Sequence, residues 1–297
     1  MTSINGKGAC SGNRRRLRMG VFASFSSVMA LALSLTVSAA LADPQRVVSL
    51  NVCTDQMAML VAAEGQLYSV SHLAADPSVS TMADTAQRYA INYGLAEEIF
   101  MMKPDLVLAG TYTTRSTVEL LRKLGIAVEE FSPATSFDEV RADFRRMGQL
   151  LGREEKVQSI LAGFDGELAA LAAQPPTGKS VALYYANSYT SGSGTLVDAV
   201  VEVAGVDNIG RRLGLNGTAK LPLEALILAN PDIIVLGDHQ YSRPALAQAN
   251  FSHPAFEAFI SDKTVLTIPP PATICGGPFT VDAARVLRNA ADEGGRS

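Results

Sequence analysis

Residues 97–110, EEIFMMKPDLVLAG, have a counterpart of the same pattern in the second half of the chain, residues 224–237, EALILANPDIIVLG. Each stretch has a Glu, six intervening residues, Pro-Asp, an apolar run and a Gly. The pattern predicts a short helix that starts near the Glu, ends before the Pro and leads into a buried strand, because Glu favours a helix start and Pro stops the helix. One unit in each half of the chain indicates two similarly built lobes.

Short apolar runs rich in β-branched residues surround these two units and alternate with helical patterns. Such alternation is typical of parallel sheets with crossover helices. The predicted strands form one group at 47–50, 68–71, 106–109 and 128–131, and a second group at 181–185, 233–236 and 265–268. We therefore expect an α/β fold of two lobes, each with a small and mostly parallel sheet.

A stretch without strand signals separates the two groups. From about Phe137 to Leu171, apolar side chains recur at helical spacing, which predicts one long helix, with Gly148, Gly152 and Gly163 as points of bending. The sequence QPPTG then ends this helix. The expected organisation is an N-terminal lobe at 43–136, a linking helix at 137–172 and a C-terminal lobe at 179–297, with a ligand cleft between the lobes.

The first 42 residues have the pattern of an export signal. A cluster of four arginines precedes an apolar run at 21–37, and Ala40-Leu41-Ala42 offers the small residues that signal peptidase needs, so we expect cleavage after Ala42. A membrane anchor is less favoured, since the run contains four serines and a threonine and no basic residue follows it closely. Cys10 precedes the run, which excludes a lipoprotein cysteine. Arg14-Arg15 leaves both the Sec and the twin-arginine route open.

The charge of the remaining 255 residues limits the class of partner. The leader holds five of the 25 basic residues and none of the 29 acidic ones, so the rest of the chain carries a formal charge of −9. This negative charge disfavours nucleic acid as a partner, because its phosphates are repelled by the chain.

The motifs resemble a cluster of ABC-importer binding proteins in which a single long helix joins two α/β lobes, the group that contains cobalamin, haem and ferric-siderophore binders. The segments that carry the resemblance are RVVSLNVCTDQMAMLVA at 46–62, the two Pro-Asp units, and HPAFEAF at 253–259. The resemblance implies a periplasmic monomer that delivers a metal chelate to an ABC permease dimer in the inner membrane. It also implies one surface Glu in each lobe that docks on the permease. By motif position these are Glu97 and Glu224, with Glu98 as the neighbouring alternative.

Ligands of open α/β sheets lie beyond the carboxyl ends of the strands, so the loops there supply the candidate contacts. Tyrosines in these loops offer apolar area and a hydroxyl, and the amides at the helix start after Asn51 suit an anionic group. The candidate ligand-binding residues are Asn51, Cys53, Thr54, Asp55, Tyr112, Arg115, Tyr185, Tyr189, His239, Tyr241 and Cys275. His239 and Tyr241 are either ligands of a haem or corrinoid metal or ordinary polar loop residues.

The protein is expected to hold no metal site or cofactor of its own. Three scattered histidines without paired carboxylates do not suit a zinc or manganese binder, which needs convergent ligands. The bound chelate would be cargo. Whether that cargo is a ferric siderophore, haem or cobalamin stays open.

The two cysteines that follow the leader have two possible states. Cys53 follows the first predicted strand and Cys275 the last, which places them on the cleft side of opposite lobes. Export favours a disulfide. A disulfide between the lobes would hold the cleft closed, however, unless the two cysteines lie at its back. We therefore expect free thiols, with one or both near the ligand.

An exported α/β enzyme such as a hydrolase is the alternative function. TSGSG at 190–194 lacks the first glycine of a nucleophile elbow, and neither a HExxH motif nor a phosphate loop occurs. GSG at 192–194 has Val197 where a dinucleotide fold needs its third glycine. The sequence therefore favours a binding protein over an enzyme.

Overall fold

The structure is a computed structural model that describes residues 43–237 and 246–293. The predicted signal peptide and the candidates His239 and Tyr241 lie outside these residues. No helix within the two described ranges combines the length and the apolar character that a bilayer crossing requires.

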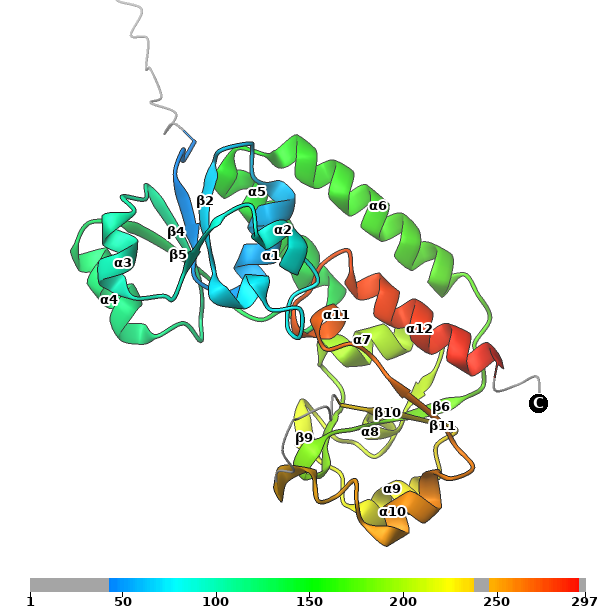
Figure 1. Ribbon diagram of the computed structural model, residues 1–297. Coiled ribbons are helices and arrows are strands. Elements are labelled where there is room, and N and C mark those ends of the chain that lie inside the picture. Colours follow the sequence, from blue (N-terminus) through cyan, green and yellow to red (C-terminus); the bar gives the residue numbers. More distant parts are fainter. Residues whose placement is uncertain (1–42, 238–245, 294–297) are drawn as a thin grey trace, which may run out of the picture. The chain divides into compact units, whose positions relative to one another are not determined.

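The first lobe is built on a five-stranded parallel sheet of order β3-β2-β1-β4-β5. Figure 1 labels β2, β4 and β5 of this sheet. Its strands are β1 Val47–Ser49, β2 Leu67–Ser71, β3 Ala90–Asn92, β4 Leu106–Gly110 and β5 Ala127–Phe131. The helical segments of this lobe are α1 Val52–Val61, η1 His72–Ala75, α2 Ala83–Ala86, α3 Ala96–Met101 and α4 Arg115–Lys123. The strand order reverses between β1 and β4, which makes their carboxyl ends the expected place for a ligand.

The second lobe has a four-stranded parallel sheet of order β11-β10-β6-β8 and an antiparallel pair, β7-β9. Its strands are β6 Ser180–Tyr184, β7 Tyr189–Ser191, β8 Asp207–Asn208, β9 Thr218–Lys220, β10 Ile233–Leu236 and β11 Thr264–Thr267. The helical segments are η2 Ala186–Ser188, α7 Leu196–Val203, α8 Ile209–Arg212, α9 Leu223–Ala229, η3 Leu246–Gln248, α10 Pro254–Ile260, α11 Pro271–Ile274 and α12 Thr280–Glu293. Here the order reverses between β6 and β10.

The predicted two-lobed α/β fold is confirmed, since each parallel sheet uses strands from one half of the chain alone. Each of the seven predicted strands occurs, with ends that differ by at most one residue. The sequence analysis missed β3, β7, β8 and β9. These strands have two or three residues and no apolar run, so nothing in their composition marks them.

The link between the lobes is two helices rather than the one that the apolar spacing predicted. These helices are α5 Phe137–Leu151 and α6 Glu154–Ala172. Gly152 ends α5 in the left-handed conformation, at φ 64°, which glycine adopts without steric cost. Gly148 lets the start of α6 approach, because a Cβ there would lie 2.9 Å from Val157. Arg141 then ties the helices together through its Nε, 2.7 Å from the Asp165 carboxylate.

Each sheet has one face on a shared core and the other on a core of its own. Helices α1, α5, α6, α7 and α12 pack into the shared core. The opposite face of the first sheet is covered by α3 and α4, with Ile99 and Leu121 fully buried. The opposite face of the second sheet is covered by α8, α9 and α10, with Leu226 and Phe256 buried. The two repeated units, α3-β4 and α9-β10, thus take equivalent places in the two lobes.

The expectation of free thiols was wrong: Cys53 and Cys275 form a disulfide, with Cα atoms 5.1 Å apart. The sequence analysis placed Cys275 directly after the last strand, but α11 lies between them and brings the chain to the start of α1. There Gly276 lies so close to Val140 of α5 that a Cβ would overlap it. The disulfide therefore joins two segments that are already packed together.

Candidate functional site

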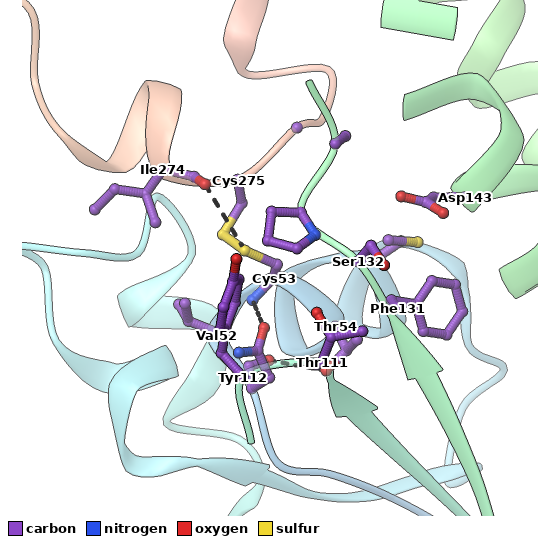
Figure 2. A pocket seen from close by; sticks show the side chains of 16 residues that line it. Val52, Cys53, Thr54, Thr111, Tyr112, Phe131, Ser132, Asp143, Ile274 and Cys275 are labelled. Atoms are coloured by element: carbon purple, nitrogen blue, oxygen red, sulfur yellow. Dashed lines mark hydrogen bonds between the residues drawn. A yellow bond between two sulfur atoms is a disulfide. The ribbon is translucent and has the colours of Figure 1, made fainter. Parts of the chain in front are cut away.

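A hollow lies where the first sheet reverses its strand order, at the start of α1 (Figure 2). It has a volume of about 210 Å³. Its walls come from the loops after β1, β4 and β5, from α5, and from the segment that carries Cys275. The lining residues are Asn51, Val52, Cys53, Thr54, Met57, Gly110, Thr111, Tyr112, Phe131, Ser132, Pro133, Ala134, Asp143, Ile274, Cys275 and Gly276.

A second hollow, of about 290 Å³, lies at the corresponding reversal of the second sheet. Its lining residues are Tyr185, Ser191, Val197, Val235, Leu236, Gly237, Ile268, Pro270, Thr273 and Ile274. Ile274 lines both hollows, so they are neighbours. Pockets that enclose a ligand usually measure roughly 300–1,000 Å³, so a ligand of chelate size has to extend over both hollows.

The loop after β1 is held by its own hydrogen bonds. Asn51 caps α1, since its Oδ1 accepts the Cys53 N–H at 3.0 Å. The buried Thr54 hydroxyl donates to the Asn51 carbonyl at 2.9 Å and lies 2.8 Å from Ser49 Oγ. Gly110 has to be a glycine because a Cβ would lie 2.8 Å from the Asn51 amide nitrogen. These contacts fix one wall of the first hollow.

Asp55 does not line either hollow, although it was a candidate ligand contact. It is fully buried, and the Ser71 N–H and hydroxyl donate to its carboxylate at 3.1 and 2.5 Å. Burial raises its pKa to about 6, and the hydrogen bonds of Ser49 and Ser71 partly oppose that rise. Asp55 thus ties α1 to the end of β2.

The candidate tyrosines have three different environments. Tyr112 follows β4 and is 86% exposed at the rim of the first hollow. Tyr185 lines the second hollow with its hydroxyl 3.2 Å from Ser191 Oγ, and burial raises its pKa. Tyr189 lines neither hollow, because on β7 its ring contacts Lys220, whose Nζ is 4.1 Å from the ring centroid.

Arg115 also lies away from both hollows. Its exposed side chain pairs with Glu119 one turn later in α4, at 3.5 Å. No described group of three or more His, Cys, Asp and Glu residues is arranged to hold a metal ion.

The sequence analysis missed Asp143 and the loop Ser132–Ala134. The loop follows a predicted strand, so the rule of strand ends could have found it. Asp143 comes from the middle of α5, where no such rule applies. It is half-buried, and burial raises its pKa to about 6, which nearby Arg146 partly opposes and Glu139 reinforces.

The described residues that line the two hollows carry almost no charge. Among the lining residues in the described part of the chain, Asp143 is the only acidic one, and none is Lys, Arg or His. The remaining polar groups are amides, hydroxyls and backbone.

Glu97 and Glu224 occupy matching positions on the outer surfaces of the lobes. Each lies in the first turn of its helix, is exposed, and forms no hydrogen bond or ion pair with another described residue. Glu98 differs, since its Oε2 accepts the Tyr93 N–H at 2.9 Å. The geometry therefore favours Glu97 over Glu98 as the group available to a partner.

Two named relatives are similar in sequence. A cobalamin-binding protein of Halobacterium salinarum is 30% identical over 207 residues, which cover 66% of this chain and 54% of the relative. A vitamin B12-binding protein of Pectobacterium carotovorum is 27% identical over 183 residues, which cover 59% of this chain and 65% of the relative. The chain thus spans about half the length of the first relative and somewhat less than two thirds of the second.

Solved structures share the fold at lower identity. The periplasmic haem-binding protein of Pseudomonas aeruginosa has a TM-score of 0.67 and 20% identity, over 83% of this chain and 92% of that one. The periplasmic vitamin B12-binding protein of Vibrio cholerae has a TM-score of 0.60 and 17% identity, over 86% of this chain and 99% of that one. The sequence itself matches the periplasmic binding protein family over residues 47–270, so the chain belongs to that family.

Proposed function

We propose that this protein captures a neutral metal chelate of the corrinoid class in the periplasm and delivers it to an ABC permease. We choose a neutral ligand because of the charge of the cleft: none of the described residues that line the two hollows is cationic. Haem carries two propionates and a catecholate siderophore carries a multiple negative charge. Burying such anions without a cationic partner costs several kcal/mol.

A corrinoid avoids this cost because its side chains are mostly amides, which the hydroxyls and backbone groups of these walls can satisfy. Its apolar faces suit Tyr112, Phe131 and Tyr185. The two relatives named for cobalamin and vitamin B12 support the same class. A neutral hydroxamate chelate also meets the charge criterion, so it belongs in the test.

The test is titration calorimetry of the exported protein with cyanocobalamin, haem, a ferric trihydroxamate and a ferric catecholate. We expect cyanocobalamin to bind with a Kd at least about 10-fold below that of any other chelate, which corresponds to about 1.4 kcal/mol. Tighter binding of haem or of the catecholate would contradict the charge argument. Tighter binding of the hydroxamate would keep that argument and overturn the corrinoid.

The proposed partner is the permease, which Glu97 and Glu224 contact from the two lobes. Exposed carboxylates on matching helices suit a partner that offers the same cationic site twice. The proposed route to this partner is export with cleavage after Ala42. The intact mass of the periplasmic protein tests that step, and a first residue other than Asp43 would contradict it.

A further inference from the structure

Asp143 stands out because, among the described residues that line the two hollows, it is the one with a charged side chain. The apolar face of α5, with Phe144 and Met147 fully buried, packs into the shared core. Asp143 lies beside that face and lines the first hollow together with Phe131 and Ser132. Figure 2 shows its carboxylate at the edge of this hollow, on the side away from the disulfide.

This carboxylate has no partner in the part of the chain that the structure describes. Within residues 43–237 and 246–293, Asp143 forms no hydrogen bond and no ion pair. Arg146, one turn later, bonds the Glu129 carboxylate and donates to the Glu130 carbonyl at 2.8 Å. Glu139, one turn earlier, accepts the N–H and hydroxyl of Thr135 at 2.6 and 2.9 Å. The neighbouring charged groups are therefore satisfied elsewhere.

An unpartnered and half-buried carboxylate is a cost to the fold. Burial raises the pKa of Asp143 to about 6, which reflects that cost. Asn or Ser at this position would avoid it. Charged groups that a fold leaves uncompensated in a cleft are candidates for a role in binding.

The chemistry of a carboxylate restricts what it can contact. When ionised it only accepts hydrogen bonds, so a ligand group beside it has to donate one. Amide N–H groups meet this condition, whereas a ligand carboxylate adds a like charge and is repelled. Asp143 would thus separate ligands that differ by a single amide-to-acid change.

We propose that Asp143 is a specificity-determining residue, which accepts a hydrogen bond from an amide N–H at the periphery of the bound chelate and rejects chelates with a carboxylate there. This inference rests on the proposed function, because the corrinoid supplies the amides. A charge-assisted hydrogen bond that is lost in a closed site lowers affinity by about 10-fold or more. Repulsion of a carboxylate at the same place should be at least as large.

The experiment compares cyanocobalamin with its monocarboxylic acids, in each of which one peripheral amide has been hydrolysed. Calorimetry measures both ligand classes on the exported wild-type protein, Asp143→Asn and Asp143→Ser. The matched control is Asp138→Asn, since Asp138 lies on the same helix, is exposed and lines neither hollow. Two different substitutions keep the test valid if one of them impairs folding, which thermal unfolding checks.

We expect the wild-type protein to prefer cyanocobalamin over at least one monocarboxylic acid by about 10-fold or more. Asp143→Asn and Asp143→Ser should reduce that preference to about 3-fold or less, while Asp138→Asn keeps it. A purely structural role would weaken all ligands alike and leave the preference unchanged. That result would overturn the role of Asp143 and leave the proposed function standing. Failure of the wild-type protein to bind cyanocobalamin at all would overturn both.

Discussion

The two lobes are alike on their outer surfaces and different on the walls that face the cleft. On the outside, α3 and α9 carry Glu97 and Glu224, and four residues later each has an exposed apolar side chain, Met101 at 73% and Leu228 at 86%. On the inside, the first lobe offers Asn51, Thr54, Ser132 and Asp143, whereas the second hollow has only Tyr185, Ser191 and Thr273 as polar side chains among its described lining residues. The repeated features suit a partner that is itself repeated, and the unrepeated ones suit an asymmetric ligand.

The two lobes also differ in the partners that they provide for a buried acidic side chain. Asp55, in the first turn of α1, is met only by serine groups, and its pKa is raised to about 6. Asp198, in the first turn of α7, accepts from the Asn208 amide and from Arg211 at 2.8 Å each. Its hydrogen bonds are the main cause of the raised pKa of Arg211. One lobe compensates its buried acid with a cation, and the other does not.

Removal of the disulfide should have the largest effect on the free energy of unfolding, because this bond joins the second half of the chain to the first. Cys53 and Cys275 are separated by 222 positions, so their bond restricts the unfolded chain strongly. Replacing both by Ser should lower the free energy of unfolding by about 2–5 kcal/mol. Denaturant unfolding measures this, with the reduced wild-type protein as control. Equal stability of the oxidised wild type and the double variant would show that the bond does not form.

Asp55, the buried acid of the first lobe that lacks a cationic partner, predicts that the free energy of unfolding depends on pH. The folded pKa of Asp55, about 6, lies above its ordinary value of 3.8, so the folded state favours the protonated form. The contribution of Asp55 to the free energy of unfolding is fully present below pH 3.8. It falls by about 3 kcal/mol as the pH rises through the folded pKa of about 6. Asp55→Asn should remove this slope. Asp143 adds a smaller slope of the same sign, because it is half-exposed.

Unfolding of both proteins between pH 4 and pH 7 tests this expectation. The difference in unfolding free energy, Asp55→Asn minus wild type, should increase with pH and level off above pH 6. Asp198→Asn is the contrasting variant: it removes the buried one of the two carboxylates that pair with Arg211, leaving only the exposed Glu202, and should destabilise the protein at pH 7. A difference between Asp55→Asn and wild type that stays constant with pH would show that Asp55 is ionised throughout.

The sequence predicted the strand framework well because buried parallel strands are continuous apolar runs, such as Leu106–Gly110 and Ile233–Leu236. It predicted a bend at Gly152 rather than a break, since the apolar positions of α5 recur at the same spacing through α6 and both helices bury them. The disulfide was missed for another reason. Nothing in the sequence places α11 against α1, and the close packing of Gly276 on Val140 is visible only in three dimensions.

The candidate site was predicted in part, for a similar reason. The rule of strand ends found Asn51, Tyr112 and Tyr185, which all line a hollow. It also selected Asp55, but the helix turns that side chain inward to Ser71. Asp143 lies in the middle of a helix, 12 positions in the sequence after the end of β5, and its special feature is that it has no partner among the described residues. That feature cannot be seen without coordinates.

The matching glutamates predict a loss of transport without loss of binding. Replacing both Glu97 and Glu224 by Lys reverses the charge of each proposed docking site. Uptake of the chelate into vesicles that contain the permease should fall by about 10-fold or more, since each pair contributes about 1 kcal/mol and reversal adds repulsion. Each single variant should have an intermediate effect. Glu98→Lys is the control, because Glu98 accepts the Tyr93 N–H within its own lobe, and its effect on uptake should be smaller.

Ligand affinity of the double variant is measured by calorimetry beside uptake. Unchanged affinity with reduced uptake would support docking on both lobes. Normal uptake would show that these two glutamates do not contact the permease. A loss from one single variant alone would confine docking to one lobe.

Replacement of the exposed apolar residues Met101 and Leu228 should have the smallest effect. It tests whether the outer surfaces of the two lobes are alike in their apolar contacts as well as in their charge. Met101 and Leu228 lie one helical turn after Glu97 and Glu224, so each pair shares a helix face. At a protein interface such side chains are desolvated beside the ion pair, which strengthens it. Replacing both by Ser should reduce the affinity for the permease about 3- to 10-fold, with ligand affinity unchanged. Val286→Ser is the control, because Val286 is also an exposed apolar residue, at 42%, but lies on α12. If Met101→Ser weakens docking and Leu228→Ser does not, the partner contacts the lobes unequally, and the likeness of their outer surfaces extends only to the glutamates.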